Sequence, residues 1–218
     1  MKSKLSDKKH LLIVPIYGLL YLIGFAIVER LITNDYVVIH TSLDDLIPFC
    51  EYFVVFYYVW FVYMAITVVF VSSGDKGDFL KTAVFLMIGM TLFVVVSVIF
   101  PNGQDLRPNE FARNNFFTKL VKGMYELDTP TNILPSIHVY NSIGCHIGLC
   151  RCKEIKDKRW ARVLSLVTCI AIIMSTMLIK QHSVLDVISA IVLSVVIYPL
   201  AYRTDWVELI EKAKNKFA

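Results

Sequence analysis

Two short stretches of this sequence carry serine, histidine and aspartate at spacings that suit nucleophilic and acid–base chemistry. The first places Pro135 and Ser136 just before His138, and the second places His182 four residues before Asp186. Residues four apart are neighbours on a helix, so the carboxylate of Asp186 can hold one ring nitrogen of His182. A histidine held in one tautomer can attack phosphorus, and another can protonate a leaving oxygen. The spacing predicts phosphoryl transfer, with His182 as nucleophile, Asp186 orienting it and His138 as acid.

A phosphoryl group also needs positive charge and amide donors around its oxygens. Arg107 offers a fork of donors that suits phosphate. A proline directly before Ser136 predicts that a helix begins here, with free N–H groups in its first turn. One turn further on, Asn141 and Ser142 are expected to support His138 from behind. We expect no metal and no cofactor, because the sequence offers no acidic cluster suited to magnesium.

The elements that must position these residues are predicted to cross a membrane. The chain has 218 residues, of which 56% are hydrophobic, and a mean hydropathy of +0.61. The apolar residues form runs of about twenty, the length that crosses a bilayer as a helix. We therefore predict an all-α fold, a single membrane domain over residues 1–218 built as a six-helix bundle. The expected spans are 11–28, 52–73, 79–100, 135–150, 163–179 and 184–202.

Six spans would place both termini on one side of the membrane. Most of the 22 Lys and Arg residues lie in the N-terminal tail, the 74–81 turn, the 151–162 loop and the C-terminal tail. Short basic segments stay in the cytoplasm, so both termini are predicted to be cytoplasmic. The net charge of +4 then reflects topology, and we expect no nucleic-acid partner. Under this topology both histidine stretches and Arg107 share the extracytoplasmic face of the cell membrane.

These residues resemble the three motifs of the type 2 phosphatidic acid phosphatase superfamily, which read K-x6-R-P, P-S-G-H and S-R-x5-H-x3-D. The matching residues are Arg107-Pro108, Pro135-Ser136-x-His138 and His182-x3-Asp186. The resemblance implies that His182 forms a phosphohistidine and that His138 is the acid. It also implies that Asp186 orients His182, and that Arg107 and Ser136 bind phosphate. The expected substrate is a lipid phosphate or diphosphate, in contact with membrane lipids.

The chain departs from the family pattern at three motif positions. Phe100 stands where the first motif has lysine, Ile137 replaces the glycine of P-S-G-H, and Thr176 replaces the arginine after Ser175. Lys180 is placed to supply one of the two missing cations. Candidates for the other are Arg113, Lys119 and Lys122. The reduced pattern also resembles the sphingomyelin and inositol phosphorylceramide synthases.

Three functions stay open on these grounds. The first is a phosphatase for lipid phosphates, and the second is a phosphotransferase that uses the same histidine pair with a lipid alcohol as acceptor. The third is a scaffold or transporter without catalysis. In that case Ser183 and Asp186 are simply a helix capping box, and Ser136 simply starts a helix. The sequence leaves the lipid and the oligomeric state open.

Overall fold

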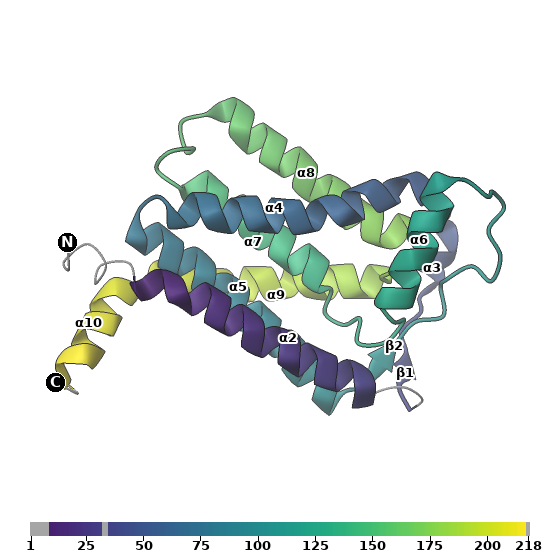
Figure 1. The fold of residues 1–218 in the computed structure, drawn as a ribbon, viewed down its shortest axis with the longest axis horizontal. Coiled ribbons are helices and arrows are strands. Elements are labelled where there is room, and N and C mark those ends of the chain that lie inside the picture. The colour runs from purple at the N-terminus through teal and green to yellow at the C-terminus, as the bar shows by residue number, and fades with distance from the viewer. Residues whose placement is uncertain (1–8, 32–34, 217–218) are drawn as a thin grey trace.

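The computed structural model describes residues 9–31 and 35–216, and this part of the chain folds into a helical bundle with one pair of two-residue strands (Figure 1). The long helices are α2 (Ile13–Leu31), α4 (Val54–Ser72), α5 (Lys76–Ile99), α7 (Ile137–Arg151), α8 (Arg159–Leu178) and α9 (Val184–Arg203). Shorter elements are η1 (Lys9–Leu12), β1 (Val37–Val38), α3 (Ser42–Leu46), η2 (Glu51–Phe53), β2 (Asn102–Gly103), α6 (Phe116–Leu127) and α10 (Trp206–Lys216).

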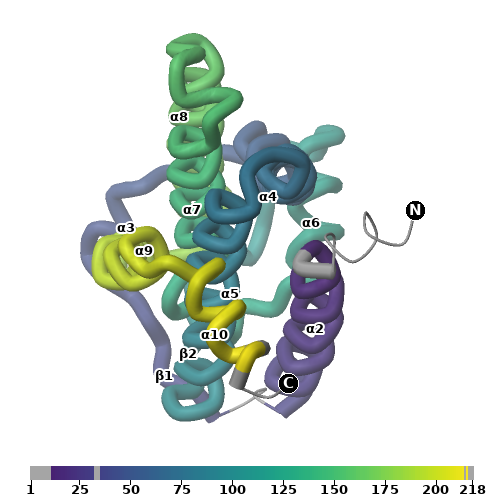
Figure 2. Tube along the Cα trace, turned by 90° about the vertical axis from the view of Figure 1, so that its left-hand side faces the viewer, coloured from purple at the N-terminus to yellow at the C-terminus, as the bar shows by residue number. Residues whose placement is uncertain are grey.

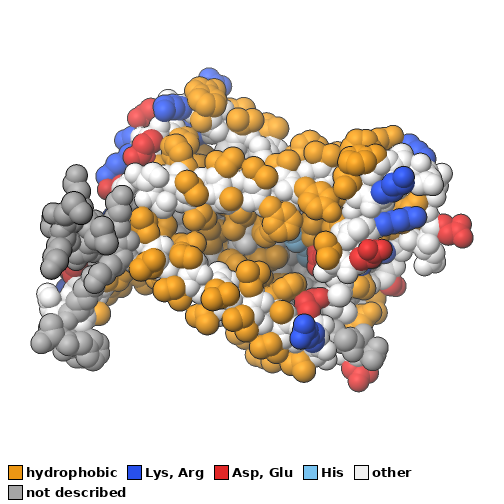
Figure 3. Space-filling view, in the orientation of Figure 1, with side chains coloured by type: hydrophobic (Ala, Val, Ile, Leu, Met, Phe, Trp, Pro, Cys, Tyr) orange, Lys and Arg blue, Asp and Glu red, His pale blue; other side chains and the backbone are white. Residues whose placement is uncertain are grey.

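Within the described residues, five helices are long and apolar enough to cross a membrane. They are Ile13–Leu31, Glu51–Ser72, Lys76–Ile99, Arg159–Leu178 and Val184–Arg203. Their outward faces carry large exposed apolar side chains, which cover most of the surface in Figure 3. A hydrocarbon solvent accounts for such a surface, because in water it would be an unusually large apolar patch. The chain is therefore an integral membrane protein.

Helix α7 is the centre of the bundle, although it is too short to count among these five. It packs against α4, α5, α8 and α9, and the view along the bundle places it among them, while α2 lies to one side on α5 (Figure 2). Because its neighbours are protein rather than lipid, α7 can carry polar side chains at membrane depth. Both Asn141 and Ser142 are fully buried in it. This setting explains why a 15-residue helix of modest hydropathy belongs to the core.

Glycines allow α5 and α7 to approach each other closely. A Cβ atom at Gly89 of α5 would lie 1.9 Å from the ring of Tyr140, and one at Gly144 of α7 would lie 2.8 Å from Phe85. The Tyr140 ring stacks on Phe85 at 4.7 Å, and its hydroxyl donates to the Phe85 carbonyl oxygen at 2.8 Å. Inside a bilayer the hydrophobic effect does not hold helices together, so helices depend on close van der Waals packing, which small residues allow. This contact fixes the position of α7 along α5.

The loops at one end of the bundle are tied together by β1, β2 and the residues around them. Strand β1 pairs with β2 in parallel, with Val37 opposite Asn102, and Gly103 forms an antiparallel bridge to Thr131. The buried side-chain oxygen of Asn102 accepts from the N–H groups of Ile133 and Leu134, each at 2.9 Å. The segment that leads into α7 is therefore held by the loop after α5.

The observed helices follow the predicted spans to within a few residues, with two differences. The connection between the predicted spans 79–100 and 135–150 contains the amphipathic helix α6, which Asn115 caps by accepting from the Thr118 N–H. Pro135, expected in the first turn of α7, lies one residue before the N-cap, which is Ser136. The basic C-terminal tail contains α10. The far end of the N-terminal tail lies outside the described residues.

Candidate active site

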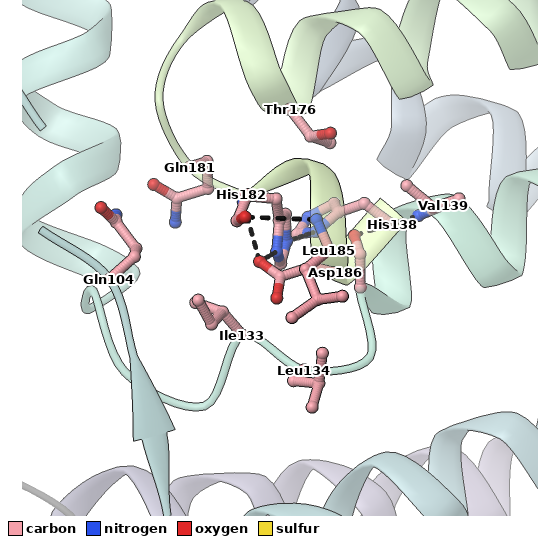
Figure 4. A network of polar contacts seen from close by, with 12 residues as sticks. Gln104, Ile133, Leu134, His138, Val139, Thr176, Gln181, His182, Leu185 and Asp186 are labelled. Atoms are coloured by element: carbon pink, nitrogen blue, oxygen red, sulfur yellow. Dashed lines mark hydrogen bonds and ion pairs between the residues drawn. The ribbon is translucent and has the colours of Figure 1, made fainter. Parts of the chain in front are cut away.

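The structure brings His138, His182 and Asp186 into direct contact (Figure 4). His138 Nδ1 lies 3.4 Å from His182 Nε2, and His182 Nδ1 lies 3.3 Å from Asp186 Oδ2. All three side chains are buried, and Asp186 completely so. The other oxygen of Asp186, Oδ1, is buried without a hydrogen-bond partner in the described structure. In this order Asp186 can hold the proton on Nδ1 of His182. Nε2 of His182 then keeps its lone pair and can act as a nucleophile.

Two helix ends set the position of His182. Helix α8 ends in a Schellman motif, in which Lys180 adopts a left-handed backbone with φ 56°. The N–H groups of Lys180 and Gln181 donate to the carbonyl oxygens of Met177 and Thr176 at 3.0 and 2.9 Å. Immediately afterwards, Ser183 and Asp186 form a capping box that starts α9. His182 is thus the single residue between the Schellman motif, which ends at Gln181, and the N-cap of α9, Ser183.

The position of His138 follows from the start of α7. Ser136 caps this helix by accepting from the Val139 N–H, and its own N–H donates to the carbonyl oxygen of Asp186 at 3.3 Å. The imidazole of His138 lies between the rings of Tyr57 and Trp60 on α4, each with its centroid 4.5 Å away. The starts of α7 and α9 are therefore joined by a backbone hydrogen bond.

A buried carboxylate from the short helix α3, distant in sequence, also fixes the start of α9. Asp44 accepts from the Val184 N–H and the Ser183 hydroxyl, both at 2.7 Å, and from the N–H and hydroxyl of Thr41. Burial alone would raise the pKa of Asp44, but these hydrogen bonds outweigh burial and lower it below its usual 3.8. The stabilisation is therefore complete above the ordinary pKa and is lost as the pH falls through the lower, folded-state value.

Replacement of Asp44 by asparagine is expected to loosen the turn that carries His182. An amide oxygen can replace one of the two carboxylate oxygens, but the NH₂ group would then face the donors that the other oxygen accepted from. We expect a loss of about 1–3 kcal/mol, because hydrogen bonds to a charged group are involved, and a several-fold lower kcat. Thermal unfolding in detergent and turnover would measure the two effects. The neighbouring exposed carboxylate, in Asp45→Asn, is the matched control and is expected to behave like the wild type.

The histidine pair lies at the floor of a cavity of about 270 Å³. Its wall comes from α2, α4, α5 and α6 and from the segments before α7 and α9, and is mostly aromatic and aliphatic. In the space-filling view a histidine is visible at the bottom of the hollow between the surfaces of α2 and α4 (Figure 3). The hollow faces the apolar side of the bundle, so an acyl or prenyl chain can approach the histidines from the side.

A family model describes most of the bundle that carries this site. The model of the PAP2 superfamily matches residues 80–209, more than half of the chain. The chain belongs to the PAP2 superfamily. No curated protein and no solved structure was found to match it. The matched region of this PAP2 protein includes both histidines, Asp186 and Arg107, whereas α2 and α4, which form one wall of the cavity, lie outside it.

The predicted cations of this PAP2 protein already have partners. The guanidinium group of Arg107 lies behind the cavity wall and donates to the carbonyl oxygens of Tyr125 and Asp128 at 3.1 and 2.5 Å and to Gln181 Oε1 at 2.9 Å. Burial lowers the pKa of Arg107, and the nearby carboxylate of Asp128 opposes that shift. Lys180 Nζ donates to the carbonyl oxygen of Asp44 at 2.7 Å. Their phosphate contacts stay a prediction.

The other predicted supporting residues lie near the pair without contacting either ring. The Ser142 hydroxyl donates to the backbone carbonyl oxygen of His138 at 2.7 Å, whereas both side-chain polar atoms of Asn141 are buried without a hydrogen bond in the described structure. Arg113, named as a replacement cation, pairs with Glu51 at 2.7 Å. Ser136 is completely buried and caps α7, and its predicted contact with phosphate stays a prediction.

Sequence reasoning missed several residues that shape the site. Asp44 of α3, Asn102 of β2 and Gln104 directly after β2 each hold a segment next to a histidine. Gln104 does so by donating to the Lys180 carbonyl oxygen at 3.1 Å. Asp128 lines the cavity beside the histidines, and no motif in the sequence pointed to it. A weak signal for Asp44 was its position within a Thr-x-x-Asp capping pattern, but nothing in the chain linked it to Ser183.

Proposed function

We propose that this PAP2 protein is a metal-independent phosphatase that removes phosphate from a lipid phosphate or diphosphate through a phosphohistidine. The observation that carries the proposal is the contact between His138 Nδ1 and His182 Nε2, with Asp186 on the far side of His182. The phosphatase chemistry typical of the superfamily and the lateral, apolar cavity support it. Nucleophile and acid both come from the chain, so the scheme uses no metal.

In the first step, the Nε2 lone pair of His182 forms a bond to phosphorus while the bond from phosphorus to the lipid oxygen breaks. Asp186 holds the proton on Nδ1 and stabilises the resulting cation. His138 gives its proton to the departing alkoxide. In the second step, His138 takes a proton from water, whose oxygen bonds to phosphorus as the N–P bond breaks. Phosphate leaves and both imidazoles regain their starting states.

Displacement at phosphorus places the nucleophile and the leaving oxygen roughly in line. His138 Nδ1 and His182 Nε2 are 3.4 Å apart, which is too close for a phosphoryl group between them. The ring of His138 therefore turns away from His182 when substrate binds. The N–H groups of Ile137 and His138 in the first turn of α7 supply oxyanion donors, since no preceding turn uses them. Ser136, Arg107 and Lys180 are the proposed side-chain contacts, and Arg107 and Lys180 make them by exchanging their present carbonyl oxygen partners for phosphate oxygens.

In the membrane, we propose that α7 is a sixth crossing and that the site faces away from the cytoplasm. The start of α2, the basic 151–162 segment and α10 lie at one end of the bundle, and the site loops lie at the other (Figure 1). The positive-inside rule assigns the basic end to the cytoplasm. Substrate then comes from the outer leaflet.

A second candidate is a phosphotransferase that takes the phosphoryl-alcohol group from a phosphodiester lipid and passes it to a lipid alcohol, so that a new phosphodiester forms. The specific support is the wall of the cavity, which is largely apolar and favours a lipid over water as the second reactant. The histidine chemistry would be the same until the second step, when an alcohol oxygen replaces the water oxygen.

Product analysis tests both candidates in one experiment. Purified protein in detergent with EDTA is incubated with phosphatidate, a prenyl diphosphate, lysophosphatidate and a phosphodiester lipid with a labelled head group, with and without diacylglycerol as acceptor. We expect inorganic phosphate from at least one substrate, at a rate unchanged by the chelator. A new phosphodiester that forms only with diacylglycerol would instead identify the phosphotransferase. Loss of all activity on chelation would contradict the metal-independent scheme, and no product with any substrate would contradict both candidates.

A further inference from the structure

The charge in the cavity is the opposite of what a simple phosphate-binding site needs. Among the described residues that line it, the charged side chain besides the two histidines is the carboxylate of Asp128. Arg107 and Lys180 do not line the cavity, and both donate to carbonyl oxygens in the loops around it. A phosphate dianion placed against His182 would therefore meet a neighbouring negative charge.

The carboxylate of Asp128 is held in place on one oxygen and left open on the other. Oδ2 accepts from Gln181 Nε2 at 2.5 Å and from the Tyr57 hydroxyl. Oδ1 has no hydrogen-bond partner within residues 9–31 and 35–216, and Asp128 forms no ion pair there. Gln181 precedes His182 in sequence, and the Tyr57 ring lies 4.5 Å from the ring of His138. Asp128 and the two imidazoles therefore line the same cavity, with Tyr57 between Asp128 and His138.

Aromatic rings form the cavity wall around this carboxylate. Tyr21 of α2 and Tyr57, Tyr58 and Trp60 of α4 all line the cavity. Faces of tyrosine and tryptophan attract cations, and a set of such rings with a carboxylate is the usual environment for an ammonium group. By its chemistry, such a wall favours an organic cation over an anion that carries no positive group.

We propose that the cavity selects lipid phosphates that carry an ammonium group close to the phosphate. The inference rests on the proposed function, because it assigns the phosphate to His182. The ammonium group would contact Asp128 Oδ1 and the aromatic wall, and would offset the charge of both the carboxylate and the phosphate. Selectivity would thus come from a residue that takes no part in bond making.

A matched pair of substrates tests this proposal. A sphingoid base 1-phosphate and its short-chain N-acyl derivative share the phosphate and the leaving alcohol, but only the first bears an ammonium group. We expect wild-type kcat/KM to be at least about tenfold higher for the amine, which corresponds to one close charge interaction. Asp128→Asn should remove most of this preference by lowering kcat/KM for the amine. Glu126→Gln, an exposed carboxylate on the neighbouring α6, should keep it.

A binding measurement covers the case in which Asp128→Asn folds poorly. A long-chain trimethylammonium amphiphile should inhibit the wild type competitively, while an alkyl glucoside of equal chain length should not. Equal inhibition by the two amphiphiles, equal turnover of the two substrates by the wild type, or an equal loss on both in Asp128→Asn would overturn the proposal. His182→Ala separates the two hypotheses: turnover of either substrate by that variant contradicts the proposed function, whatever the preference.

Discussion

His182→Ala is expected to reduce release of phosphate by about 10⁴-fold or more, because deletion of a nucleophile removes the covalent step entirely. The side chain is buried between two capped helices, and the backbone hydrogen bonds around it do not involve the ring. The variant should therefore fold like the wild type. Rapid acid-free quenching with ³²P-labelled substrate should show acid-labile, base-stable label on the wild type and none on the variant.

His146→Ala is the matched control for this experiment. His146 lies on α7 nearer its other end, half-buried, with Nδ1 3.0 Å from the Ser165 hydroxyl. Loss of this histidine should leave turnover and labelling within a few-fold of the wild type. Label that persists in His182→Ala would show that another residue is the nucleophile, and the assignment of roles within the pair would be wrong.

His138→Ala is expected to affect the two chemical steps in different ways. With a natural alkyl phosphate, loss of the acid should slow turnover by about 10²–10⁴-fold. An aryl phosphate needs little protonation of its leaving group, so the first step should recover with that substrate. Label on His182 should then accumulate, because His138 is also the base that activates water in the second step.

Stopped-flow release of the aryl alcohol measures the first step and phosphate release measures the second. A burst of alcohol equal to the amount of enzyme, followed by slow phosphate release, is the expected result for His138→Ala. Equal losses with alkyl and aryl substrates would instead show that His138 only packs between Tyr57 and Trp60. In that case the acid would have to come from another group.

The helical framework was readable from the sequence because lipid imposes a simple pattern. Runs of about twenty apolar residues mark spans regardless of the neighbouring helices. The predicted span of 163–179 corresponds to α8 and that of 184–202 to α9, and both helices meet the length and hydropathy required. The pairing of His138 with His182 was also predictable, because the resemblance placed both in one family pattern and the structure brings them into contact.

The surroundings of the pair were not predictable, because they depend on contacts between distant segments. Asp44 reaches Ser183 and Val184 across more than half of the chain, and no local pattern encodes that contact. Likewise, Arg107 matches the arginine of the family motif in sequence, but its guanidinium group donates to the backbone carbonyl oxygens of Tyr125 and Asp128. The sequence shows which residue types are present and how they are spaced. Burial and hydrogen bonds in the fold decide whether each side chain faces the ligand.

Because Gly89 lies so close to Tyr140, a substitution at position 89 would affect both the stability of the core and the position of His138. Tyr140 follows His138 by two residues on the same rigid helix, so any side chain larger than hydrogen at position 89 would displace His138, the proposed acid, as well as the core. Variants selected for greater robustness should therefore accumulate on the lipid-facing sides of α2 and α8, where a change does not reach α7. In the middle of α5, a substitution that changes stability should also change the position of His138 and with it the activity.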